Sequence, residues 1–170
     1  MKTLDLAWKI IYFPIWKEEL YMPVIEKEIE INAPLEDIFS IAQDVEDYPH
    51  FMPSIKSVQI LEKEGNRRVT QWIARVEELG RTISWKEEDF WDEERKECRF
   101  RLLEGDFNRY EGIWTFHRVG DSTLVRLKIE YEMHIPLIGA LLQGLIKRKV
   151  EESATDMLEG LKERCELGKV

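Results

Sequence analysis

The residues best suited to chemistry lie in the short run TISWKEEDF, where aromatic and acidic side chains alternate. Every second residue of a strand points to the same face, so Trp85, Glu87 and Asp89 would share one. Two neighbouring carboxylates on an inward face repel each other, and they need a raised pKa or a basic partner such as Arg101. The alternative is that this end of the strand faces water and both carboxylates are solvated. The charged run that follows, WDEER, favours the solvated alternative.

Metal and thiol chemistry have little support in the sequence. The histidines His50, His117 and His134 share no spacing typical of metal ligands, so we expect no metal site. The two cysteines, Cys98 and Cys165, form no C-x-x-C motif. We therefore expect both to be reduced thiols of a cytoplasmic protein.

The overall charge restricts the class of partner. The formal net charge is -9, whereas binding to nucleic acid calls for a basic face, so we expect no nucleic-acid partner. Charged residues make up 35% of the chain, and Asn and Gln together number only seven. This balance is typical of proteins from hot environments and indicates a thermophilic origin.

Residues 1–22 differ from the rest of the chain, and we treat 23–170 as one domain. The stretch LDLAWKIIYFPIW has an apolar helical face, but it is too short to cross a bilayer. It either lies on a membrane surface, as amphipathic aromatic segments do, or packs on the domain or on a second subunit. The acidic residues Asp5, Glu18 and Glu19 weaken attraction to anionic lipid and favour packing.

The elements that would position the acidic run follow from hydrophobic periodicity. Residues 24–31 alternate and predict a strand, and 35–45 carry an apolar helical stripe that ends before Pro49 and Pro53. A long helix follows Pro136. Short turn-type connections predict antiparallel hairpin strands at 57–62, 67–78, 81–90, 96–103, 107–118 and 123–134.

This order predicts an α+β fold in which a curved antiparallel sheet of six to seven strands wraps a long C-terminal helix. A strongly bent sheet and one helix leave space between them, which is either filled by large side chains or remains a cavity.

Two motifs, with the long final helix, carry a resemblance to a known family. Residues 32–62, NAPLEDIFSIAQDVEDYPHFMPSIKSVQILE, and 104–116, EGDFNRYEGIWTF, are similar to the polyketide cyclase/dehydrase and coenzyme Q-binding (START-like) family of the Bet v 1/SRPBCC superfamily. The resemblance covers residues 23–165. It implies the helix-grip fold and a cavity that binds hydrophobic molecules, with neither a metal nor an organic cofactor.

The resemblance implies a set of residues around that cavity. Tyr48 and Phe51 are expected to form its mouth, facing the start of the last helix; the less favoured alternative is that they cap the core. The more apolar Trp72–Ala74–Val76 face of the 67–78 strand is expected to point inward, and Phe107 is expected in the core. The candidate ligand-binding residues are Tyr48, Phe51, Trp72, Trp85, Arg101, Tyr110, Trp114, Ile129, Tyr131, Leu141 and Leu145.

Three functions are compatible with this set. A carrier or chaperone for a lipid, quinone or polyketide-like molecule needs only an apolar pocket with a few polar anchors. A cofactor-free aromatase/cyclase needs proton-transfer groups.

The candidate catalytic residues match the cyclases only in part. Arg101 resembles a cavity arginine of the cyclases, but Glu87 and Asp89 stand where those similar enzymes carry serine and arginine. Arg101 and Glu87 are thus only weak catalytic candidates, and a non-enzymatic carrier is favoured. The third function is a protein- or ribosome-interaction module. We expect the protein to be cytoplasmic, and residues 1–22 would provide either peripheral contact with the membrane or self-association.

Overall fold

The structure is a computed structural model that describes residues 23–133 and 140–167, except for the side chains of residues 79 and 140–142. The expectations for residues 1–22 and for the side chain of Leu141 lie outside this description.

In the described part of the chain, one antiparallel sheet of seven strands forms the body of the protein, in the order β1-β7-β6-β5-β4-β3-β2. Alternation of apolar and polar residues produces these strands: in β7 every second side chain is buried and the others face outward. The α+β expectation is confirmed. The strands are β1 (Val24–Ile31), β2 (Ile55–Glu64), β3 (Arg67–Val76), β4 (Arg81–Asp92), β5 (Glu97–Gly105), β6 (Arg109–Val119) and β7 (Ser122–Glu132).

Two α-helices and two short 3-10 helices complete the described fold. Helix α1 (Leu35–Gln43) starts directly after Pro34, and η1 (Val45–His50) contains Pro49, which has no amide proton to continue a regular helix. The turn η2 (Glu77–Leu79) joins β3 to β4. The long helix α2 (Ala140–Leu167) is the predicted C-terminal helix. No helix in the described residues is long and apolar enough to cross a membrane.

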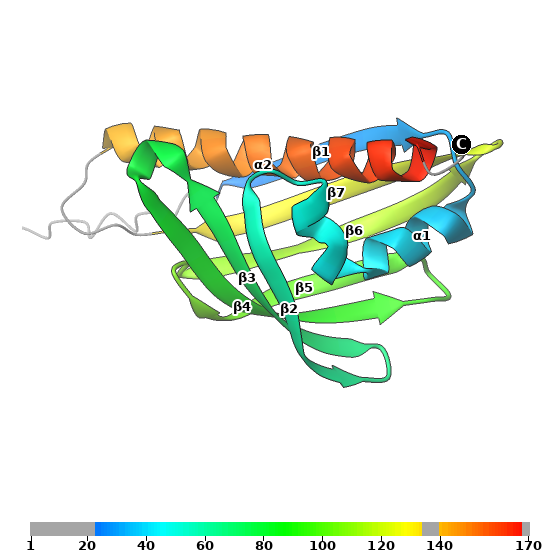
Figure 1. Cartoon of the computed structure of the whole chain (residues 1–170), viewed down its shortest axis with the longest axis horizontal. Coiled ribbons are helices and arrows are strands. Elements are labelled where there is room, and N and C mark those ends of the chain that lie inside the picture. Colours follow the sequence, from blue (N-terminus) through cyan, green and yellow to red (C-terminus); the bar gives the residue numbers. More distant parts are fainter. Residues whose placement is uncertain (1–22, 134–139, 168–170) are drawn as a thin grey trace, which may run out of the picture.

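Helix α2 lies across the concave side of the sheet, as Figure 1 shows, and one half of it is packed more tightly than the other. The C-terminal half buries Ala154, Leu158, Leu161 and Cys165. Near this end α1 inserts Phe39, whose ring makes edge contacts with Trp91 and Phe116. The other half of α2 spans the strongly curved β3 and β4, and there the interior is not filled.

Candidate functional site

A cavity of about 300 Å³ lies between β3, η2, β4 and the N-terminal half of α2. Its volume is at the lower end of the range typical of small-molecule sites. The apolar part of the wall comes from four strands, the residues next to their ends and the helix, so no single segment of sequence reveals it. The apolar residues that line it are Pro53, Ala74, Val76, Ile83, Trp85, Phe107, Tyr110, Ile129, Met133, Leu145, Ile146 and Val150.

Aromatic rings form the inner end of this cavity. The Trp85 ring contacts Phe107 and Tyr110, each with ring centroids 5.4 Å apart, and Phe107 lies 4.7 Å from Tyr110. On the other side Trp85 stacks on Trp72, its cross-strand partner on β3, at 5.8 Å and 7°. Rings held by several neighbours form a rigid, flat, apolar surface.

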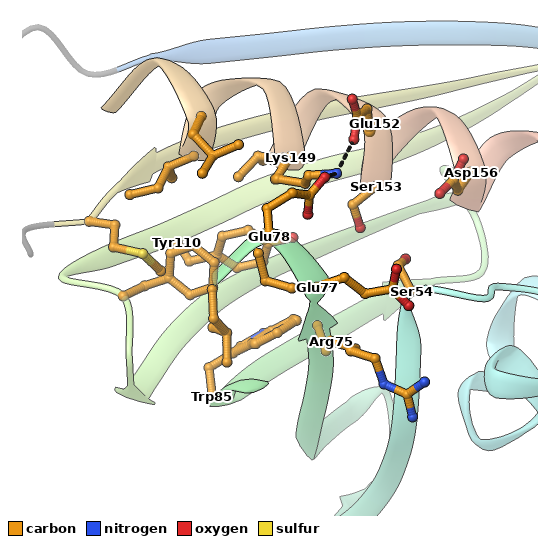
Figure 2. Close-up of a pocket in the computed structure, with 18 of the residues that line it drawn as sticks. Ser54, Arg75, Glu77, Glu78, Trp85, Tyr110, Lys149, Glu152, Ser153 and Asp156 are labelled. Atoms are coloured by element: carbon orange, nitrogen blue, oxygen red, sulfur yellow. Dashed lines mark hydrogen bonds and ion pairs between the residues drawn. The ribbon is translucent and has the colours of Figure 1, made fainter. Parts of the chain in front are cut away.

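Charged side chains surround the mouth. Lys149 of α2 forms ion pairs with Glu152, at 2.7 Å, and with Glu78 of η2. Figure 2 shows Lys149 and Glu152 joined on the helix with Glu78 beneath them, and Trp85 and Tyr110 on the strands. The hydrogen bond from Lys149 lowers the pKa of Glu78 from its ordinary value. This ion pair therefore links the two elements between which a ligand would enter.

A second, much smaller chamber of about 20 Å³ lies behind Trp85 and Tyr110, which form part of the wall of both spaces. A chamber of this size holds about one water molecule or one oxygen atom of a ligand. It is lined by Trp72, Trp85, Glu87, Phe100, Tyr110, Trp114, Leu127 and Met157.

Two carboxyl groups lie on the same face of β4, Glu87 in the wall of this inner chamber and Asp89 two residues further along the strand. Glu87 is 5% exposed and Asp89 is 4% exposed. Trp85 Nε1 donates to Glu87 Oε2 at 2.7 Å, and Thr70 Oγ1 donates to Asp89 Oδ2 at 2.8 Å. Burial, and next the charge of Asp89, raises the pKa of Glu87 well above its ordinary range; burial raises the pKa of Asp89 to about 6. Near neutral pH the pair therefore holds one proton. This proton stays on Glu87, whose carboxyl donates a hydrogen bond to the Asp89 carboxylate.

The groups around the pair set its electrostatics. Arg68 of β3 is buried, donates to the carbonyl oxygen of Gln43 at 2.5 Å, and favours the ionised form of Asp89. The hydroxyl of Tyr48 and the thiol of Cys98 both have pKa values well above their ordinary range, first through burial and then through nearby charges, including Asp89. All these groups are neutral at neutral pH except Arg68 and Asp89.

The expectation that Glu87 and Asp89 are solvated is wrong. The strand does run into a charged hairpin, but at residues 87–89 it is still covered on its inner face. Thr70 lies opposite Glu87 on β3, and Arg68 lies opposite Asp89. Charged residues nearby in sequence did not indicate where the solvent boundary falls.

The expectation that Arg101 lines the cavity is also wrong. Phe100 points inward on β5, where it occupies the space beside Gly112, so Arg101 points to the outer face. Its side chain is 64% exposed, and its Nε donates to Glu88 Oε2 at 2.6 Å. Arg67 binds the same carboxylate, and the two arginines hold the pKa of Glu88 below its ordinary value.

Tyr48 and Phe51 do not form the mouth, contrary to the favoured expectation. Tyr48 is 3% exposed, its hydroxyl donates to the Ala42 carbonyl oxygen at 2.6 Å, and its ring packs on Trp72. Phe51 lies against Gly160, far from the start of α2. Pro53 and Ser54, just beyond the predicted cluster, line the cavity instead.

The other candidates fall into two groups. Tyr131 is buried in the core and lines neither of the two spaces. The sequence reasoning missed Phe107, which is buried and also lines the cavity. The candidates found in the wall of the cavity or the chamber are Trp72, Trp85, Glu87, Tyr110, Trp114, Ile129 and Leu145. The inward orientation expected for Trp72, Ala74 and Val76 agrees with this arrangement.

This architecture is the helix-grip fold of START-like proteins. Residues 31–158 match the family described as polyketide cyclase / dehydrase and lipid transport, and the chain belongs to that family.

Relatives with known structures share the fold. TTHA0849 from Thermus thermophilus is 35% identical, with a TM-score of 0.82 over 87% of this chain and 100% of that chain. The Zhui aromatase/cyclase from Streptomyces sp. R1128 is 19% identical, with a TM-score of 0.80 over 86% of this chain and 94% of that one. A Streptomyces halstedii protein, provisionally named a polyketide cyclase, is 30% identical over 102 residues, which are 59% of this chain and 94% of that one.

Proposed function

We propose that the protein binds a hydrophobic small molecule, such as a lipid, a quinone or a polyketide-like compound, in the cavity beneath α2 and acts as its carrier. Membership of the family indicates either hydrophobic ligand binding or cyclase activity. The observation that carries the proposal is the unfilled apolar space of about 300 Å³ between the aromatic wall and the helix. A protein core normally contains no void of this size.

Carrier function has more support than cyclase function. Binding requires apolar walls and a few polar anchors, and the wall between Trp85 and Ile146 supplies both. The arginine expected to assist a cyclase points to the outer face of the sheet, where it is paired with Glu88.

A neutral fluorescent dye tests binding. Nile red fluoresces strongly only in an apolar environment, and we expect it to bind one dye per chain. Ala74→Trp would fill the cavity from β3 and should abolish the signal. The matched control is Ile73→Trp, which adds the same ring on the opposite face of the same strand and should leave binding unchanged. Equal dye binding by both variants, or no binding by the unmodified protein, would refute the proposal.

Transfer distinguishes a carrier from a cyclase. A carrier should accelerate exchange of Nile red between phosphatidylcholine vesicles, and Ala74→Trp should remove that acceleration. A protein that binds the dye without accelerating its exchange is not acting as a carrier.

A further inference from the structure

Tyr110 has a polar group that the fold leaves unused. The side chain is 7% exposed, and its hydroxyl makes no hydrogen bond to any residue within the described ranges. The ring contributes to the walls of both the cavity and the inner chamber. The hydroxyl oxygen is not one of the fully enclosed polar atoms of the described residues that lack a partner, so it borders space that a small molecule can reach. A hydrogen-bond donor that faces such space and has no partner in the protein is available to a ligand atom that accepts a hydrogen bond.

Glu87 borders the same inner chamber from β4. Its carboxyl accepts the Trp85 indole proton on one oxygen and is bonded to Asp89 through its own proton. The chamber therefore has largely apolar walls, and its polar groups include the Tyr110 hydroxyl and the Glu87 carboxyl.

We propose that Tyr110 and the Glu87–Asp89 pair form a site that recognises the carbonyl oxygen of a neutral, flat, apolar ligand whose body lies in the larger cavity. This inference rests on the proposed binding function and specifies the chemical class of the ligand. A hydroxyl group and a protonated carboxyl group that line one chamber can both donate hydrogen bonds to the same acceptor oxygen, as in enzyme sites that polarise ketones.

Size and charge narrow the ligand class. The inner chamber of about 20 Å³ admits one oxygen atom but not a ring, so the rings of the ligand stay against Trp85 and Phe107. An anionic group is disfavoured, because the nearest carboxyl pair already carries one negative charge near neutral pH. The ligand therefore presents a carbonyl rather than a carboxylate at this end.

The proton content of the pair links binding to pH. Near neutral pH the protonated Glu87 carboxyl donates its hydrogen bond to the Asp89 carboxylate, so Tyr110 alone donates a hydrogen bond to the ligand. When Asp89 also gains a proton, near pH 6, it can donate to Glu87, and the Glu87 proton becomes available to the carbonyl oxygen. The other titratable groups that face the pair are Arg68 on β3, Cys98 on β5, Tyr48 on η1 and Tyr110 itself, whereas Glu88 points to the outer face of β4. None of these groups changes charge between pH 5 and pH 7, since the thiol and the phenols stay protonated and Glu88, whose pKa is lowered, stays ionised.

A pair of probes that differ by one oxygen tests the inference. 9-Fluorenone and fluorene have the same flat tricyclic body, but only fluorenone carries a carbonyl group. Each would be titrated against bound Nile red at pH 7, and the ratio of their affinities compared between the unmodified protein and Tyr110→Phe. Loss of one hydrogen bond should reduce the preference for fluorenone about tenfold in Tyr110→Phe. The C=O stretch of bound fluorenone should also move to higher frequency in this variant.

A second variant tests the contribution of the carboxyl pair. The preference for fluorenone should increase as pH falls from 7 to 5 in the unmodified protein, and it should be independent of pH in Glu87→Gln, which cannot share a proton. If fluorene and Nile red bind but the preference and the C=O frequency are the same in Tyr110→Phe, the carbonyl site is refuted and the binding function stands. If Nile red itself does not bind, both proposals fail.

Discussion

The buried Asp89 carboxyl should make the stability of the protein depend on pH in a defined window. Its pKa is raised from 3.8 to about 6 by burial, so the unfolded chain loses this proton first as pH rises. The free energy of unfolding should therefore fall between about pH 4 and pH 6 and be unaffected by this group above that window. The difference between the two pKa values corresponds to a loss of about 3 kcal/mol, since one pKa unit is 1.36 kcal/mol.

Asp89→Asn removes this contribution, and with it the effect of the Asp89 charge on Glu87, because the amide cannot ionise yet its oxygen can still accept the Thr70 hydrogen bond. Urea unfolding of both proteins from pH 4 to pH 8 gives the difference in free energy at each pH. Any fixed cost of the amide NH₂ is the same at every pH and does not affect the trend. The variant should gain about 3 kcal/mol relative to the unmodified protein between pH 4 and pH 7, or roughly 6 to 12 °C in Tm. A difference that is constant with pH, or that decreases as pH rises, would show that Asp89 is not buried with a raised pKa.

Two further predictions concern packing and the outer face. Gly160→Ala should destabilise the protein by about 1 to 3 kcal/mol, because the new Cβ would lie 2.6 Å from the Phe51 carbonyl oxygen; Gly144→Ala, with no atom within 4 Å of its Cβ, should instead stabilise by up to about 1 kcal/mol in the same chemical denaturation assay. Equal effects of the two alanines would contradict the contact between α2 and Phe51. Arg101→Ala should leave Nile red affinity unchanged and lower stability by no more than about 1 kcal/mol, since its ion pair with Glu88 lies on the outer face and Arg67 still binds that carboxylate. A tenfold loss of dye affinity in this variant would place Arg101 in the binding site after all.

Much of the architecture was predictable because it depends on local alternation. The burial of every second residue in β7 and the inward face of Trp72, Ala74 and Val76 follow from the two-residue period of a strand. The resemblance to the START-like family supplied the arrangement of sheet and long helix, and the family match confirms it.

The errors arose where distant segments meet. Alternation correctly placed Glu87 and Asp89 on one face with Trp85, but their burial depends on Thr70 and Arg68 from β3, which no local pattern reveals. Whether Arg101 faces inward depended on which residue of β5 opposes Gly112 of β6.

The position of Tyr48 depended on a third kind of long-range contact. Whether it forms a rim or part of the core depended on where α2 crosses η1, and Gly160 sets that crossing by allowing Phe51 to approach closely. Predictions from one strand identify faces, whereas the boundary between core, cavity and solvent is a property of the assembled layers.

The central claim is that the space beneath α2 holds an apolar molecule, and native mass spectrometry of the purified protein measures this directly. We expect part of the protein to carry one additional small molecule, which organic solvent extracts and which absorbs or fragments as a neutral carbonyl compound. The adduct should be absent from Ala74→Trp and present in Ile73→Trp. An adduct of the same mass on Ala74→Trp would place the ligand elsewhere and contradict the account.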